Sequence, residues 1–292
     1  MPVCWPPDVR AGPAVHTEAI DGRCAPSDGW GFRRGDELAP DRRVIRRLGD
    51  GGAHEAYVVE TAGRGLAVAK LPRPSVADDI HRLVSLRDEA RALRRLAAPA
   101  VPRHLETILT GEHPHLLMEY VPGPTLRTVL AGRGTLPAEL VASLGRDLAR
   151  GLDAVARAGW VHLDVKPSNV VVNAVPRLLD FELARPAASA ARMPHPTGTW
   201  QYMAPEQRAA GRPGGARIGT PADVFALAVT LGEALVGRAL GRSADPEPLP
   251  GALGAVLTAA LAPAPDDRPG ARELADALSA CADDEPRRAL AA

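Results

Sequence analysis

Residues 162–169 read HLDVKPSN, and the apolar run 170–172 follows them directly. The segment places a carboxylate (Asp164), a cation (Lys166) and an amide (Asn169) within six residues. Together these groups can orient a hydroxyl, neutralise a phosphate and hold a metal ion. A solvated loop before a strand is the ordinary alternative, but it does not account for this combination at this spacing.

The segment resembles the catalytic loop of protein kinases, and a lysine two residues after the aspartate is the form found in Ser/Thr kinases. The resemblance implies that Asp164 is the catalytic base and that Asn169 is a magnesium ligand. It also implies that Lys166 offsets charge on the transferred phosphoryl group.

Leu163 departs from the family, which often has arginine at this position. That arginine normally binds a phosphate of the activation segment through bidentate hydrogen bonds, which leucine cannot form. We therefore predict that activity does not require phosphorylation between Asp180 and Glu206, for example at Ser189 or Thr197.

Residues 48–57 read LGDGGAHEAY and are similar to the glycine-rich loop that covers the phosphates of ATP. The resemblance assigns phosphate binding to three glycines, Gly49, Gly51 and Gly52. Glycines let backbone N–H groups approach phosphate oxygens without an intervening side chain. His54 replaces the third glycine of the family and Ala53 the usual aromatic residue, so we expect a looser hold at the tip of the loop.

Residues 67–70 (AVAK) look like the strand whose lysine contacts the α- and β-phosphates. Nineteen residues after Lys70, Glu89 lies in a predicted helix and matches the glutamate that pairs with this lysine. The resemblance thus gives Lys70 and Glu89 catalytic roles and places Val68 among the nucleotide-binding residues. Glu89 taken alone would be one more exposed helical charge.

Residues 116–121 (LLMEYV) resemble the hinge between the kinase lobes, with Met118 guarding the back of the adenine pocket. Backbone groups of Glu119 and Val121 would bind adenine, and Val171 is a further expected nucleotide contact. A plain edge strand remains the alternative for these residues.

Residues 178–182 (LLDFE) occupy the position of the metal-binding Asp-Phe-Gly motif, which makes Asp180 the second expected ligand of Mg²⁺. Glu182 replaces the glycine, and this loss of backbone freedom argues against the inward and outward flip known in the family.

Residues 198–206 (GTWQYMAPE) are similar to the end of a kinase activation segment. By resemblance, Thr199 bonds near Asp164 and Lys166, and Glu206 pairs with Arg268. Asp223, at the start of an apolar helix, matches a structural aspartate of the family.

The composition narrows the class of protein. Among 292 residues, Lys+Arg and Asp+Glu both number 35, which gives no basic surface for nucleic acid. Lysine occurs only at Lys70 and Lys166, and arginine supplies the other 33 basic residues. The three cysteines lack disulfide or zinc spacing, and the longest apolar segment, 224–236, is too short and polar for a membrane span. We expect a cytoplasmic protein.

Local patterns predict strands at residues 43–48, 56–60, 65–71, 105–109, 115–120, 170–172 and 177–179. Helical spacing of apolar residues predicts helices at 78–97, 138–158, 223–236, 253–261 and 271–280.

The expected fold is α+β and bilobal, as in protein kinases, with a small β-rich N-lobe carrying one key helix and a larger, mainly helical C-lobe. We expect an irregular extension at 1–35, a kinase domain at 36–282 and a short tail at 283–292. Within the domain, the N-lobe spans about 36–118, the hinge 119–122 and the C-lobe 123–282.

The predicted function is an ATP- and Mg²⁺-dependent Ser/Thr protein kinase that acts on protein hydroxyls, with the protein itself as a candidate substrate. Two alternatives stay open. His54 and Glu182 motivate a pseudokinase that binds nucleotide without turnover. Glu182 also occurs in small-molecule phosphotransferases of the aminoglycoside and choline kinase type, but those enzymes lack the activation segment seen at 198–206. The oligomeric state is not predicted.

Overall fold

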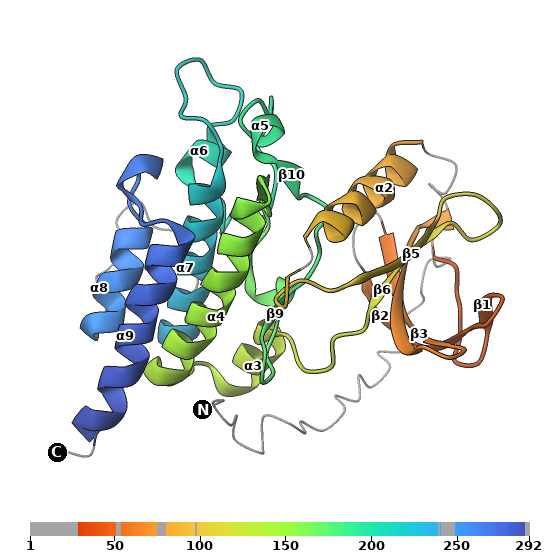
Figure 1. The fold of residues 1–292 in the computed structure, drawn as a ribbon, viewed down its shortest axis with the longest axis horizontal. Helices are drawn as coiled ribbons and strands as arrows, with labels where there is room; N and C mark the ends of the chain where they lie inside the picture. Colours follow the sequence, from red (N-terminus) through yellow and green to blue (C-terminus); the bar gives the residue numbers. More distant parts are fainter. Residues whose placement is uncertain are drawn as a thin grey trace, which may run out of the picture. The chain divides into compact units, whose positions relative to one another are not determined.

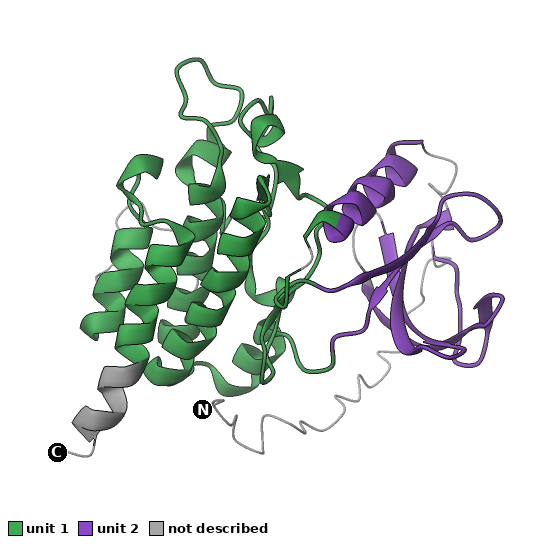
Figure 2. Cartoon of the chain, in the orientation of Figure 1, with its two compact units in different colours: residues 1–6, 95–101, 122–292 green, residues 7–94, 102–121 purple. Residues whose placement is uncertain are grey.

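The computed structural model describes residues 29–50, 54–74, 80–96, 98–238, 240 and 249–289. Its chain divides into two compact units (Figures 1 and 2). The N-terminal unit contains the described residues up to Arg94 together with Pro102–Val121. The C-terminal unit contains Arg95–Val101 and the described chain from Pro122 onward.

The N-terminal unit is built on a six-stranded antiparallel sheet with strand order β1-β2-β3-β4-β6-β5. The strands are β1 (Glu37–Ala39), β2 (Arg42–Asp50), β3 (His54–Thr61), β4 (Gly65–Pro72), β5 (His104–Ile108) and β6 (His115–Glu119). Along β4 the side chains alternate, with Ala67, Ala69 and Leu71 buried on one face and Lys70 on the other. Among the described residues of this unit, α2 (Ile80–Arg95) is the helix.

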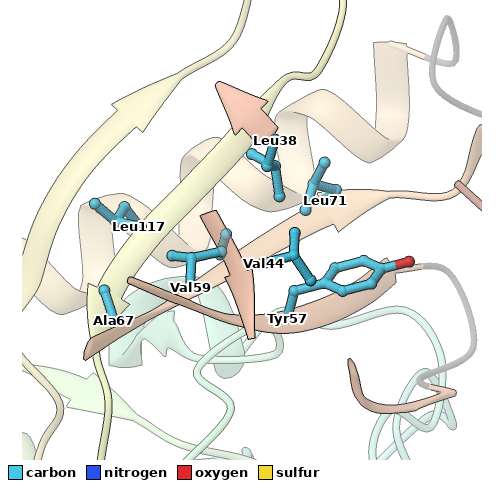
Figure 3. Close-up of a cluster of buried hydrophobic side chains, with 8 residues drawn as sticks. Leu38, Val44, Tyr57, Val59, Ala67, Leu71 and Leu117 are labelled. Carbon is cyan, nitrogen blue, oxygen red and sulfur yellow. The ribbon is translucent and has the colours of Figure 1, made fainter. Parts of the chain in front are cut away.

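Buried apolar side chains of five strands, β1, β2, β3, β4 and β6, form the core of this sheet, as Figure 3 shows. The labelled members are Leu38, Val44, Tyr57, Val59, Ala67, Leu71 and Leu117. Trp30 and Phe32 pack against this cluster, although both precede the predicted N-lobe. The Trp30 indole N–H donates to the backbone oxygen of Pro72 at 2.7 Å.

The C-terminal unit is mainly helical. Its helices are α3 (Leu126–Arg133), α4 (Ala138–Arg157), α5 (Ala187–Ala190), α6 (Pro205–Arg208), α7 (Thr220–Val236), α8 (Gly251–Ala260) and α9 (Ala271–Ala289), with 3₁₀ turns η2 (Pro167–Asn169) and η4 (Pro265–Asp267). Helix α4 lies against both α7 and α9 (Figure 1). Every residue of α7 from Ala222 to Ala234 is buried, which explains why its sequence is mostly apolar on all sides.

Two short antiparallel pairs bracket the segment 162–169. The first joins β7 (Trp160–Val161) to β10 (Arg185–Pro186), and the second joins β8 (Val170–Val171) to β9 (Arg177–Leu178). These pairs fix both ends of the loop, so its side chains stand on a supported backbone.

The predicted α+β class, with a β-rich first lobe and a helical second lobe, is confirmed. The main strands and helices lie where the sequence predicts them, and α9 continues past the predicted end at Ala280. Of the glycine-rich loop, Gly51, Gly52 and Ala53 lie outside the described residues. In the described part of the chain, no helix has the length and apolar character that crossing a membrane requires.

Candidate active site

The buried carboxylate of Asp223, near the start of α7, anchors the first residues of the loop 162–169 through hydrogen bonds. Its Oδ2 accepts the backbone N–H of His162 at 2.7 Å, and its Oδ1 accepts that of Leu163 at 2.8 Å. Complete burial raises the pKa of Asp223, while these two donors act in the opposite direction. Leu163 has φ +70°, a conformation that non-glycine residues seldom adopt. The two hydrogen bonds therefore stabilise a strained backbone immediately before Asp164.

The carboxylate of Asp164 receives hydrogen bonds from three residues. Its Oδ1 accepts from the backbone N–H and the hydroxyl of Thr199, at 3.0 and 2.7 Å. Its Oδ2 accepts from Lys166 Nζ at 2.7 Å and from Asn169 Nδ2 at 3.2 Å. Lys166 also donates to Thr199 Oγ1 at 2.8 Å. The side chain is thus oriented at both oxygens, with one positive charge beside it.

His162 joins this loop to the chain around Asp180. Its Nε2–H donates to the carbonyl of Leu179 at 3.1 Å, while Nδ1 accepts the backbone N–H of Asp164 at 3.3 Å. Because one ring nitrogen donates and the other accepts, this geometry describes a neutral imidazole. The ring also packs on buried Phe181, with centroids 4.6 Å apart. Both chain neighbours of Asp180 are therefore held by a single side chain.

The two predicted metal ligands, Asn169 and Asp180, offer oxygen donors. The amide nitrogen of Asn169 is committed to the backbone oxygen of Asp164 at 3.0 Å, so its Oδ1 is the atom left for a cation. The backbone oxygen of Asn169 accepts the N–H of Leu179 at 2.7 Å, which ties the segments bearing the two ligands together. A carboxylate and an amide oxygen suit Mg²⁺, which prefers hard oxygen ligands and keeps several of its waters.

In the N-terminal unit, Lys70 on β4 and Glu89 on α2 form an ion pair. Lys70 Nζ lies 2.8 Å from Glu89 Oε2, and the two side chains are 12% and 1% exposed. The structure thus brings together the lysine and the glutamate that the sequence places 19 residues apart. With its charge held by a buried carboxylate, the ammonium is fixed in direction.

The other predicted nucleotide residues lie in both units. Gly49 has φ +155° within β2, a value that favours glycine. Val68 on β4 is half-buried and is paired with Met118 on β6.

The backbone N–H of Glu119, one of the two predicted adenine-binding residues, donates to the backbone oxygen of Arg103 at 2.9 Å. In the C-terminal unit, Val171 is buried in β8 and bridges to Thr125. Val121 is half-buried.

The segment 198–206 is anchored by the pair formed between Glu206 and Arg268, and the predicted pairing is confirmed. The guanidinium binds both carboxylate oxygens, at 2.7 and 2.9 Å. Its remaining N–H groups donate to the backbone oxygens of Pro221, Ala262 and Pro263. All five guanidinium donors are thus satisfied, which is what a buried arginine requires.

A second anchor of this segment is not predicted by the sequence. Tyr202 donates its hydroxyl to Glu233 Oε2 at 2.6 Å, while Arg127 donates to Glu233 Oε1 at 2.7 Å and to Tyr202 Oη at 2.5 Å. Burial, together with the hydrogen bond to Glu233, raises the pKa of the Tyr202 hydroxyl. The network connects α3, the segment after Thr199, and α7.

Gln207 is the other residue that the sequence does not single out. Its side chain is buried and reaches the backbone beside both Asp164 and Thr199. The available signal is its position directly after Ala204-Pro205-Glu206 and the rarity of glutamine, which occurs only here and at Gln201.

Comparison with known proteins gives one consistent result. The family model "Protein kinase domain" matches residues 42–250. The chain is 32% identical over 254 residues to the probable serine/threonine-protein kinase PkwA of Thermomonospora curvata, a match that covers 81% of this chain and 34% of PkwA. It is 32% identical over 288 residues to the serine/threonine-protein kinase pkn2 of Myxococcus xanthus, which covers 83% of this chain and 33% of the relative.

A third relative, the serine/threonine-protein kinase PknD of Mycobacterium tuberculosis, is 34% identical over 209 residues, covering 70% of this chain and 30% of PknD. The matched region spans about a third of the length of each of these three relatives.

Proposed function

Because the chain belongs to the protein kinase domain family, we propose that it transfers the γ-phosphate of ATP to serine and threonine hydroxyls of proteins. The observation that carries the proposal is the hydrogen-bonded group of Asp164, Lys166 and Thr199. Asp164 and Lys166 offer a charged acceptor and a cation on a loop whose backbone is fixed at both ends, and the hydroxyl of Thr199, from the segment 198–206, contacts both.

In the proposed reaction, Asp164 orients the incoming hydroxyl and accepts its proton as the oxygen attacks the γ-phosphorus. The bond from that phosphorus to the bridging oxygen breaks, and ADP leaves. Lys166 donates to the transferring phosphoryl group and offsets its charge. Thr199 already presents a hydroxyl to Asp164 Oδ1 at 2.7 Å, and this contact supports the reach of the carboxylate to a hydroxyl donor.

Lys70 would bind the α- and β-phosphates, with Glu89 directing its ammonium. Asn169 Oδ1 and the carboxylate of Asp180 would hold Mg²⁺, which neutralises phosphate charge when bound. We assign adenine binding to the carbonyl of Glu119, since its N–H is already donated, and to the backbone N–H of Val121. Gly49, Gly51, Gly52, Val68 and Val171 complete the proposed nucleotide contacts.

A protein substrate is favoured over a small molecule by the segment that follows Thr199. Glu206 with Arg268, and Tyr202 with Glu233, anchor a chain segment directly beside Asp164. Small-molecule phosphotransferases have no such segment, so these anchors support a surface for protein chains. We further propose that the protein acts in the cytoplasm and that its own chain is one of its substrates.

The test is transfer of labelled γ-phosphate from ATP by the purified full chain with Mg²⁺, using casein and myelin basic protein as acceptors. We expect Asp164→Asn to lower the rate by roughly 10²–10⁴-fold, because the carboxylate that accepts the proton is gone. Asp153→Asn, the same exchange at an ion pair on the surface of α4, is the matched control and should keep the wild-type rate.

Two outcomes would reject the proposal. Asp164-dependent label found only on small alcohols or amines, such as choline and kanamycin, would indicate a small-molecule phosphotransferase. ATP binding without any Asp164-dependent transfer would indicate a pseudokinase.

A further inference from the structure

The amide of Gln207, near the end of α6, is almost completely buried, with the residue 1% exposed. Its Nε2 donates to the backbone oxygen of Leu163 at 2.8 Å and to that of Thr197 at 2.6 Å. Its Oε1 accepts the backbone N–H of Ala204 at 3.4 Å. Both N–H groups of one amide are thus spent on carbonyls from two separate segments.

Each of these carbonyls lies next to a group of the proposed catalytic site. Leu163 immediately precedes Asp164, and Thr197 is separated from Thr199 by a single glycine. The contacts between Thr199 and Asp164 are short, at 2.7 and 3.0 Å, so they need the two backbones at a fixed separation. Gln207 supplies that constraint, since one planar amide holds both chains.

Gly198 gives a second, independent indication that close approach is required here. It has φ +123°, which strains any other residue. A Cβ at this position would lie 2.6 Å from Leu163 O and 2.9 Å from Gln207 Nε2. Any side chain at 198 would therefore separate the carbonyl from the amide that binds it.

The contact between the Gln207 amide and the Leu163 carbonyl involves no charged group. Leu163 is 3% exposed and carries no charge, so it cannot bind a phosphate, while the amide of Gln207 binds carbonyls in any phosphorylation state. We propose that Gln207 is a positioning residue, which holds the activation segment against the catalytic loop and makes the unphosphorylated protein competent for transfer. This inference rests on the proposed kinase function.

The first test replaces Gln207 with methionine, which keeps the length of the side chain and removes both donors. In protein treated with phosphatase and shown by mass spectrometry to carry no phosphate, we expect kcat to fall at least tenfold. The KM for ATP should stay within twofold, because Lys70, Asn169 and Asp180 are untouched. This separation of kcat from KM distinguishes positioning from a general loss of structure.

The second test follows the backbone amide of Thr199, which donates to Asp164, by hydrogen exchange. We expect its exchange to be at least tenfold faster in Gln207→Met than in wild type. Gln201→Met is the matched control, since it makes the same exchange in the same segment, and it should leave the exchange of Thr199 unchanged.

Gly198→Ala provides a second variant in which Gln207 is kept but its approach to Leu163 is blocked. We expect the same fall in kcat and the same faster exchange. Wild-type kcat and wild-type exchange in either folded variant would overturn the inference, as would a requirement of the wild type for phosphate before transfer. If wild type transfers no phosphate at all, the proposed function fails, and the exchange rate of Thr199 still decides whether Gln207 positions this segment.

Discussion

Both lysines of the chain contact a carboxylate of low exposure. Lys70 lies 2.8 Å from Glu89 and Lys166 lies 2.7 Å from Asp164, and these carboxylates are 1% and 7% exposed. Lysine is a compact charge with three donors that can serve several partners, whereas arginine is a planar fork that favours both oxygens of one carboxylate. At Asp164 the second oxygen is already bound by Thr199, so a fork would compete with that contact.

The exchange Lys70→Arg tests this reasoning in the N-terminal unit. We expect the protein to fold and the charge to be kept, while phosphoryl transfer falls on the order of 10²-fold, because the fork engages Glu89 and no longer presents a compact charge to a phosphate. Initial rates with labelled ATP and thermal unfolding measure the two effects. Arg91→Lys, the reverse exchange on the exposed side of α2, is the control, and a fully active Lys70→Arg protein would contradict the argument.

The sequence predicts those site residues that belong to motifs with a characteristic spacing. It does not predict residues whose side chains bind backbone groups far away in the chain. The spacing between Lys70 and Glu89 predicts a pair, and the structure contains it. Gln207 binds carbonyls 44 and 10 residues away in the chain, and no local spacing predicts such contacts. The sequence also does not predict the left-handed backbone conformation at Leu163, because this conformation depends on hydrogen bonds to Asp223 from a different element.

The ion pair between Glu206 on α6 and Arg268 after η4 is almost completely buried, with side chains 1% and 0% exposed. Arg268→Leu should lower the free energy of unfolding by about 3–5 kcal/mol, since it leaves the charge of Glu206 buried without a partner. Urea denaturation followed by circular dichroism measures this loss.

The control for that prediction is Arg157→Leu, which breaks an ion pair with Asp153 on α4 where the arginine side chain is 63% exposed. Its effect should stay within about 0.5 kcal/mol, because exposed pairs contribute little. Equal effects of the two variants would show that burial is not what makes the Arg268 pair important.

From the surroundings of His115 on β6 we predict that the free energy of unfolding depends on pH. Its Nδ1–H donates to His113 O at 2.7 Å and its Nε2 lies 3.1 Å from the Arg42 guanidinium, so the ring is held neutral. Burial, aided by the charge of Arg42, lowers its pKa below the ordinary 6.5, although the hydrogen bond to the His113 carbonyl and the charge of Glu106 act to raise it. His104 on β5 is shifted in the same direction, chiefly by burial and then by Arg94.

The direction of this pH dependence follows because proton binding and unfolding are thermodynamically linked. Below pH 6.5 the unfolded chain binds a proton that the folded ring resists, so the free energy of unfolding should fall as the pH drops below this value. Denaturation between pH 7.5 and 5.5 measures the slope, and His115→Asn, which keeps a donor near His113 but does not titrate, should flatten it. An unchanged slope in this variant would mean that other groups cause the acid sensitivity.

Long periodic elements are predictable, while short or isolated ones depend on tertiary pairing. The apolar spacing of α4 and α7 predicts both helices to within a few residues. The apolar periodicity does not predict helix α3, but its capping residues could have indicated it. Thr125 caps its start by accepting the backbone N–H of Thr128, and Gly134 ends it. The two-residue strands β7 and β10 exist only because they pair across more than twenty residues of chain.

At the scale of the whole chain, each unit is completed by a segment that the predicted lobe boundaries leave out of it. In the N-terminal unit, Trp30 and Phe32 enclose the ring of His113, with centroid distances of 4.9 and 5.0 Å. The backbone N–H of Trp30 also donates to the buried carboxylate of Glu55 at 3.3 Å. These residues precede the predicted lobe, and composition alone indicates only an irregular segment there.

In the C-terminal unit, the corresponding segment is Arg95–Val101, which joins it before the chain returns to β5. The backbone oxygen of Ala100 accepts the N–H of Leu178 at 2.8 Å, and Arg177 donates to Val101 O at 3.2 Å. Gly151 of α4 makes room for this segment, because a Cβ there would lie 2.5 Å from the Cβ of Ala100.

Gly151→Ala should therefore destabilise the protein by about 1–3 kcal/mol, as overpacking does, even though alanine favours helices. Gly132→Ala in α3 is the matched comparison. A Cβ at that position meets nothing within 4 Å, so the lower entropy of the unfolded chain should stabilise the protein by about 0.4–1 kcal/mol. Urea denaturation of the full chain measures both signs. A stabilising Gly151→Ala would show that the segment before β5 can move away from α4 at no cost, and that the C-terminal unit does not depend on it.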